Sequence, residues 1–251
     1  MRFQAHRGVS SEFPENTLPA FHAAKEQGYH VIELDPLFTA DNQCVTFHDQ
    51  YINRTCRTNS GECIESPVQA SQLTYRELVS YDAGVFMGER FRGTRVPLLA
   101  DVMEIARREG LTVKIDNRFS DFPEQQQNML FDIVKESGAR TAFTCKNPQI
   151  VKNVVSRFQE AEIHYDGYVD EKTVQQMRAM IRENPFTVWL PLQSELTNWV
   201  KVPFANPFLC EMVKRYAELG LWIVQTQNQY HQAVKLGADI IETNGTLKPR
   251  K

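Results

Sequence analysis

Five residues have the types and the spacing that catalysis requires: His6, Glu33, Asp35, His48 and Asp116. Each lies at the end of a predicted strand. Glu33 and Asp35 stand two residues apart in an otherwise apolar run, so their side chains point to the same face. Burying two carboxylates together is unfavourable unless a cation compensates their charge, and their oxygens suit Mg²⁺ or Ca²⁺. A nearby histidine could transfer protons at neutral pH.

Each of these residues also has a simpler explanation. A histidine at a strand end is often structural or merely exposed, and an aspartate after a strand commonly caps a helix or occupies a turn. The grouping favours chemistry, because all five positions fall at the carboxyl ends of strands, where barrel enzymes carry their catalytic groups. We therefore expect one shared site, with Asp116 as the third metal ligand.

Strands that alternate with helices must position these residues. Apolar and β-branched runs predict strands at residues 2–5, 31–35, 44–48, 111–116, 141–146, 162–166, 187–192, 221–226 and 239–243. Helical spacing of apolar residues predicts helices at 16–27, 100–109, 124–137, 148–159, 171–182, 207–219 and 228–236. This alternation predicts a parallel sheet. The nine strands fit an eight-stranded barrel if 31–35 and 44–48 form a local hairpin-like excursion; a doubly wound open sheet remains an alternative.

The stretch from residue 49 to 96 interrupts the alternation, and we interpret it as an insertion on a single domain of residues 1–251. The length of 251 residues is close to that of one (β/α)₈ domain. The net charge of −3 does not favour a nucleic-acid partner. The sequence contains no run of eighteen apolar residues, so we expect no membrane span.

The cysteine pattern argues against a zinc site. There are five cysteines, an odd number, and no pair of C-x-x-C spacings. Reduced cysteines are typical of the cytoplasm, where we expect the protein unless a signal peptide has been removed.

Short motifs follow one another through the first part of the chain: HRG at 6–8, PENT at 14–17, IELD at 32–35, FHD at 47–49 and RT at 54–55. Their order and spacing resemble those of glycerophosphodiester phosphodiesterases. The resemblance continues more weakly in VPLL at 96–99 and in GADIIETN at 237–244. It implies a (β/α)₈ TIM barrel with a small insertion after the second barrel strand, and hydrolysis of a glycerophosphodiester to glycerol phosphate and an alcohol.

The resemblance also implies roles for individual residues. Glu33, Asp35 and Asp116 would hold one divalent metal ion, Mg²⁺ or Ca²⁺, and His6 and His48 would be the general base and acid, in an order that the sequence does not assign. Arg7 and Arg118 would bind the phosphate. These roles make physical sense, since a cation and an arginine offset the charge of the phosphodiester and of its transition state.

Four positions depart from the family pattern. Asp116 and Arg118 stand where the family has a glutamate and a lysine, and Lys146 and Gln225 replace aromatic residues at strand ends. If Lys146 and Gln225 line the substrate pocket, the departing alcohol should be polar or anionic. The alternative is that Lys146 is exposed or pairs with a nearby carboxylate.

Two other functions compete with this prediction. The same barrel could act on a different polar or sugar phosphodiester, as a phospholipase-like enzyme does, or it could bind a phosphorylated ligand without catalysis. The presence of all three acidic ligands and both histidines argues against a non-catalytic barrel.

Overall fold

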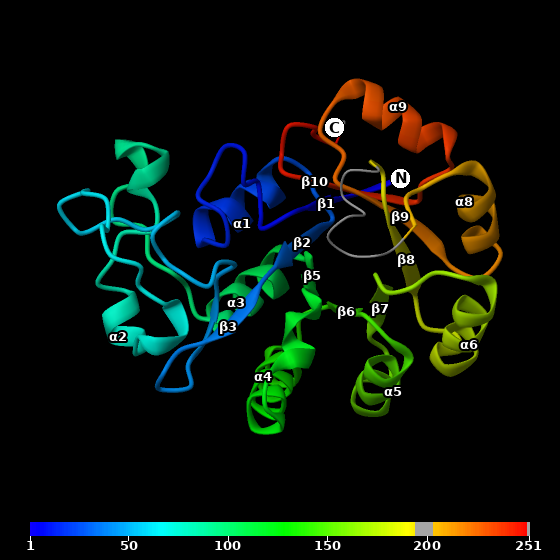
Figure 1. The fold of residues 1–251 in the computed structure, drawn as a ribbon, viewed down its shortest axis with the longest axis horizontal. Coiled ribbons are helices and arrows are strands. Elements are labelled where there is room, and N and C mark those ends of the chain that lie inside the picture. Colours follow the sequence, from blue (N-terminus) through cyan, green and yellow to red (C-terminus); the bar gives the residue numbers. More distant parts are fainter. Residues whose placement is uncertain (194–202, 250–251) are drawn as a thin grey trace.

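Eight parallel strands close into a barrel in the computed structural model, which describes residues 1–193 and 203–249 (Figure 1). The ring closes because β1 pairs with β2 on one side and with β10 on the other. The barrel strands are β1 (Arg2–Ala5), β2 (Val31–Leu34), β5 (Thr112–Ile115), β6 (Thr141–Cys145), β7 (Glu162–Tyr165), β8 (Phe186–Pro191), β9 (Glu218–Trp222) and β10 (Ile240–Thr243). The expected (β/α)₈ TIM barrel is confirmed, and the open sheet is excluded.

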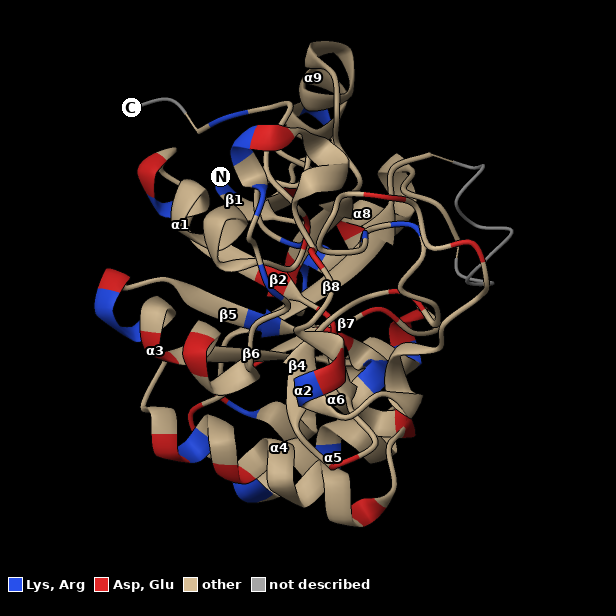
Figure 2. Cartoon of the chain, turned by 90° about the vertical axis from the view of Figure 1, so that its left-hand side faces the viewer, with Lys and Arg blue, Asp and Glu red and all other residues tan. Residues whose placement is uncertain are grey.

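Helices connect successive strands and cover the outside of the barrel. They are α1 (Leu18–Glu26), α3 (Leu99–Glu109), α4 (Glu124–Ser137), α5 (Pro148–Arg157), α6 (Glu171–Ile181), α8 (Pro207–Lys214) and α9 (Gln227–Lys235). Figure 2 shows charged residues of both signs on outer helices such as α3 and α4. No helix of the described residues is both long enough and apolar enough to cross a membrane. All five cysteines are unpaired.

One predicted boundary is wrong. We expected a helix to residue 219 and a strand at 221–226, but α8 ends at Lys214 and β9 begins at Glu218. Glu218 and Gly220 interrupt the apolar run that would mark this strand. Gly220 is required by packing, since a Cβ there would lie 2.5 Å from the ring of Trp189.

The insertion begins earlier than expected. The strand β4 (Cys44–Thr46) pairs with β3 (Pro36–Phe38) and not with β2, which belongs to the barrel. The hairpin and the segment that includes α2 (Tyr75–Leu78) project to the left of the barrel in Figure 1. The segment has its own apolar cluster, formed by Val45, Phe47, Ile52, Cys56, Ala70, Leu78, Ala83 and Val96.

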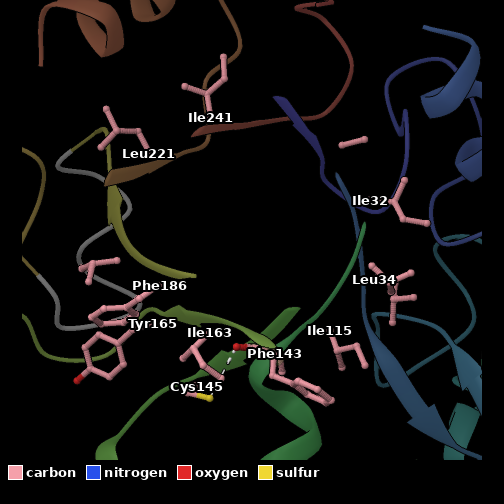
Figure 3. Packing of buried hydrophobic residues seen from close by; sticks show 14 of the residues in the cluster. Ile32, Leu34, Ile115, Phe143, Cys145, Ile163, Tyr165, Phe186, Leu221 and Ile241 are labelled. Carbon is pink, nitrogen blue, oxygen red and sulfur yellow. Dashed lines mark hydrogen bonds between the residues drawn. The ribbon is translucent and has the colours of Figure 1, made fainter. Parts of the chain in front are cut away.

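Alternation along the strands gives the barrel two different faces. Outward-facing side chains such as Ile32, Leu34, Ile115 and Ile163 surround the barrel and belong to the main apolar core (Figure 3). The residues between them point inward, and many are polar and buried: Gln4, Glu33, Lys114, Thr144, His164 and Glu242. The centre of the barrel is therefore a charged interior.

Candidate active site

A cavity of about 320 Å³ lies at the carboxyl ends of the barrel strands. Of the nine residues predicted for the site, seven line it: His6, Arg7, Glu33, Asp35, His48, Asp116 and Arg118. They come from the ends of β1, β2 and β5 and from the residues after β4. Parallel strands bring these positions to one end of the barrel, although His6 and Asp116 are far apart in the sequence.

A tight turn after β1 delivers Arg7 to the acidic residues. Arg7 and Gly8 have φ values of 57° and 77°. A Cβ on Gly8 would lie 2.7 Å from the backbone of Ala20 in α1, so glycine is needed both for its conformation and for this close approach. The turn allows the backbone N–H of Arg7 to donate to Glu33 Oε2 at 2.9 Å, while its Nε lies 3.3 Å from Asp35 Oδ2.

Glu33, Asp35 and Asp116 form an acidic cluster. One oxygen from each lies within 4.8 Å of the others, and Glu33 and Asp35 are each 3% exposed. Burial and the charge of Asp35 raise the pKa of both Glu33 and Asp116. Three carboxylates so close together repel one another unless a cation lies between them. Hard divalent cations prefer oxygen ligands of this kind. The donor set therefore matches Mg²⁺ or Ca²⁺.

Asn16 holds one of these carboxylates in place. Its Nδ2 donates to Asp35 Oδ2 at 2.8 Å, and its Oδ1 accepts from the backbone N–H of Asp35 at 3.2 Å. Asn16 itself has a left-handed φ of 56°, which asparagine tolerates better than most residues. Asn16 therefore orients Asp35 within the cluster.

The two histidines are oriented in the same way. His6 Nδ1 lies 2.7 Å from Asn244 Oδ1, and His48 Nδ1 lies 2.7 Å from Asp49 Oδ1. Because both partners are oxygen acceptors, the proton belongs on Nδ1 in each ring and Nε2 is left to exchange a proton. The partners differ in charge, since Asn244 is a neutral amide and Asp49 is a carboxylate.

Arg118 is hydrogen-bonded to the backbone at His48. Its backbone N–H donates to Asp116 Oδ1 at 3.0 Å, and its Nη1 donates to the carbonyl oxygens of Phe47, at 3.4 Å, and of His48. It thus connects the acidic cluster to the loop that carries a histidine. These contacts support a positioning role in addition to the expected binding of phosphate.

The structure does not bring Lys146 and Gln225 to this cavity. Lys146 Nζ pairs with Asp121, as the alternative explanation anticipated, and Gln225 Oε1 accepts from Thr246 Oγ1 at 2.8 Å. Instead, the aromatic residues Trp189 and Trp222 line the cavity. The expectation of a polar or anionic alcohol therefore loses the contacts on which it was based.

Three charged residues of the site were missed by the sequence analysis: Lys114, Asp166 and Glu242. Lys114 Nζ lies 3.2 Å from Glu242 Oε2 and 4.3 Å from the centre of the Trp189 ring. Asp166 Oδ2 accepts from Asn117 Nδ2 at 2.6 Å, whereas Oδ1 is buried without a partner among the described residues. Inward position on a strand is the signal that would have found them.

The fold and the cavity define a (β/α)₈ barrel with a candidate cation site beside two histidines. Residues 6–244 match the family described as the glycerophosphoryl diester phosphodiesterase family. The chain belongs to this family, as the motif resemblance predicted.

Relatives of known name agree with this assignment. A glycerophosphodiester phosphodiesterase of Caldanaerobacter subterraneus subsp. tengcongensis is 38% identical over 112 residues, which are 45% of this chain and 43% of that protein. The match thus spans less than half of that relative's length. A human lysophospholipase D is 25% identical over 281 residues, which cover 98% of this chain and 84% of that protein.

Solved structures show the same fold. A phosphodiesterase of Oleispira antarctica, in complex with the product sn-glycerol-3-phosphate, has a TM-score of 0.76 at 17% identity and covers 98% of this chain and 94% of its own. A glycerophosphodiester phosphodiesterase of Thermotoga maritima has a TM-score of 0.65 at 18% identity, with 97% and 94% covered.

Proposed function

We propose that this protein hydrolyses a glycerophosphodiester to glycerol phosphate and an alcohol with the aid of one divalent cation. The observation that carries the proposal is the convergence of the acidic cluster (Glu33, Asp35 and Asp116) and two oriented histidines on one cavity. The family supports the same reaction.

The residues of the cavity divide the chemical work. Glu33, Asp35 and Asp116 would hold the cation, and a cation bound there supplies positive charge to the phosphoryl oxygens. Arg7 adds a second positive charge beside the cluster. Burial acts to lower the pKa of its guanidinium, but the negative charges of Asp35 and Glu15 outweigh burial and raise this pKa.

His6 and His48 act as the acid–base pair. One ring removes the proton of the attacking hydroxyl, and the other gives a proton to the departing alkoxide; each transfer contributes roughly 10²- to 10⁴-fold. The attacking hydroxyl is either water or the 2-hydroxyl of the glycerol, which would give a cyclic phosphate before hydrolysis. Capturing a cyclic glycerol phosphate in a single turnover would establish the second route, and its absence would exclude it.

The reaction is tested by release of glycerol phosphate from a panel of diesters with choline, ethanolamine, glycerol and inositol head groups, together with a lysophospholipid. Each is assayed with Mg²⁺, with Ca²⁺ and with chelator. His6→Ala should abolish metal-dependent release. His22→Ala is the matched control, because His22 also pairs with a carboxylate, Glu109, but is exposed on the outside of the barrel. Turnover that survives chelation, or equal loss in both variants, would contradict the proposal.

Leaving-group chemistry separates the two histidines. Nitrophenolate is a stable anion that leaves a diester without being protonated. The variant that lacks the general acid should therefore retain much of its rate on a nitrophenyl diester. The variant that lacks the general base should lose its rate on every substrate. Equal behaviour of His6→Ala and His48→Ala would refute the division of roles.

The cytoplasm is the proposed location, since all five cysteines are free. Fractionation of the source cells, followed by detection of the protein, tests this assignment; recovery outside the cytoplasm would contradict it.

A further inference from the structure

Arg54 connects two loops that lie beside the cavity. Its Nη1 and Nη2 donate to Glu15 Oε2 and Oε1 at 2.8 and 2.7 Å. Its Nε and Nη2 donate to Asp49 Oδ2 and Oδ1 at 2.5 and 3.0 Å. Glu15 belongs to the loop between β1 and α1, whereas Asp49 follows β4 at the start of the insertion. The planar guanidinium therefore pairs with two carboxylates, each through both oxygens.

Each of these carboxylates holds a different group of the candidate site. Asp49 Oδ1 also accepts from His48 Nδ1 at 2.7 Å, and Glu15 Oε1 also accepts from Arg7 Nη1 at 2.9 Å. Arg54 thus stands one residue away from the proton-transfer group on one side and from the phosphate-binding group on the other. It does not line the cavity itself.

The charges of the network favour this arrangement. Burial acts to raise the pKa of Asp49, but hydrogen bonds from Arg54 and His48 lower it to about 2. Burial likewise opposes ionisation of Glu15, and the hydrogen bond from Arg54 and the charge of Arg7 lower the pKa of Glu15. Both carboxylates are therefore ionised at neutral pH and act as fixed acceptors.

We propose that Arg54 is a positioning residue that holds His48 through Asp49 and Arg7 through Glu15, so that one side chain aligns proton transfer with phosphate binding. The proposal rests on the proposed phosphodiesterase function. An arginine that served only as a surface ion pair would contribute little to stability and nothing to turnover, because exposed pairs are weak.

The kinetic test compares Arg54→Ala with Arg92→Ala. Arg92 is the matched control: it is 40% exposed against 49% for Arg54, and it pairs with Glu89 in the same insertion but with no group of the cavity. Arg54→Ala should lower kcat/KM by roughly 10- to 100-fold, as expected for displaced catalytic groups, whereas Arg92→Ala should leave it unchanged. Equal effects of the two variants would overturn the proposal.

The two branches are separated by further variants. Asp49→Asn should lower kcat, because it acts on His48, and Glu15→Gln should raise KM, because it acts on Arg7. In the combined Glu15→Ala, Asp49→Ala background, Arg54→Ala should have no further effect, since both of its carboxylate partners are already removed. Full additivity would show that Arg54 acts by another route.

Methylguanidine should restore part of the lost rate to Arg54→Ala, and Arg54→Lys should remain impaired, because a lysine cannot pair with both carboxylates in this way.

A readout without turnover separates this proposal from the proposed function. In ¹⁵N-labelled protein, long-range proton–nitrogen spectra report which ring nitrogen of His48 carries the proton. Arg54→Ala should shift the His48 ring from the single Nδ1–H form toward a mixture of tautomers, and Arg92→Ala should not. Unchanged His48 signals in Arg54→Ala would overturn the coupling even in an active enzyme. If wild type releases no glycerol phosphate but the signals change, the function fails and the coupling stands.

Discussion

Replacing Asp166 with asparagine should stabilise the protein, and the gain should grow with pH. Asp166 has one carboxyl oxygen bonded to Asn117 and the other buried without a partner among the described residues. Burial and the nearby Asp116 raise its pKa from 3.8 to about 7. Asparagine has nearly the same shape and carries no charge, so it can keep the bond to Asn117.

The magnitude follows from linkage between protonation and folding. Above pH 4 the unfolded chain releases this proton while the folded chain retains it up to about pH 7, so stability falls as the pH rises through this range. A difference of about three pKa units at about 1.4 kcal/mol each gives a full penalty of about 4 kcal/mol. Between pH 5 and pH 8 the advantage of Asp166→Asn should therefore grow by about 2.5 kcal/mol.

Urea unfolding at pH 5, 6, 7 and 8, with chelator present, measures this advantage. Asp132→Asn is the matched control, because Asp132 is exposed on α4. A difference between Asp166→Asn and wild type that stays flat from pH 5 to pH 8 would refute the reasoning, since it would mean that Asp166 titrates alike in both states.

Three further predictions concern the turn, the acidic cluster and the expected pocket. Gly8→Ala should destabilise the protein by roughly 1–3 kcal/mol more than Gly93→Ala in urea unfolding. Both glycines have a positive φ, but of the two only Gly8 has other atoms within 4 Å of an added Cβ. Equal losses would show that the close approach at Gly8 is unimportant. Asp116→Asn should weaken the binding of Mg²⁺ or Ca²⁺ measured by calorimetry. In chelator at neutral pH it should raise the stability of the protein, since burial and repulsion by Asp35 raise the pKa of Asp116. An unchanged affinity would show that Asp116 is not a cation ligand. Lys146→Ala should change kcat/KM by less than about twofold on choline and inositol diesters, because exposed ion pairs contribute little, and a selective loss on one diester would return Lys146 to the pocket.

The sequence was sufficient where a site residue belongs to a local motif. His6 and Arg7 follow one strand, Glu33 and Asp35 end the next, and the alternation of a strand already predicts that the two carboxylates share a face. Their meeting with Asp116 follows from parallel strands, which the order of elements predicted, in a closed barrel, which the family resemblance implied.

For the missed residues, the local pattern gives the inward direction of the side chain but not the partner that makes a buried charge acceptable. Lys114 and Glu242 are interior positions of strands, and each is acceptable there only because the barrel places the other beside it, 128 residues away in the chain. A buried lysine without its partner would look like an error in a core strand. The start of β9 was missed for a similar reason, since Gly220 is explained only by the ring of Trp189.

Closure of the barrel has a consequence for biosynthesis. His6 precedes its partner Asn244 by 238 residues in the chain, and β1 pairs with β10. Until β10 leaves the ribosome, β1 has an unpaired edge, and such edges can pair with other chains. Contacts of such long separation also slow folding. A chaperone that shields the β1 edge on the nascent chain should therefore raise the yield of folded protein more than one added after release, and pulse-labelled synthesis with each addition would measure the difference.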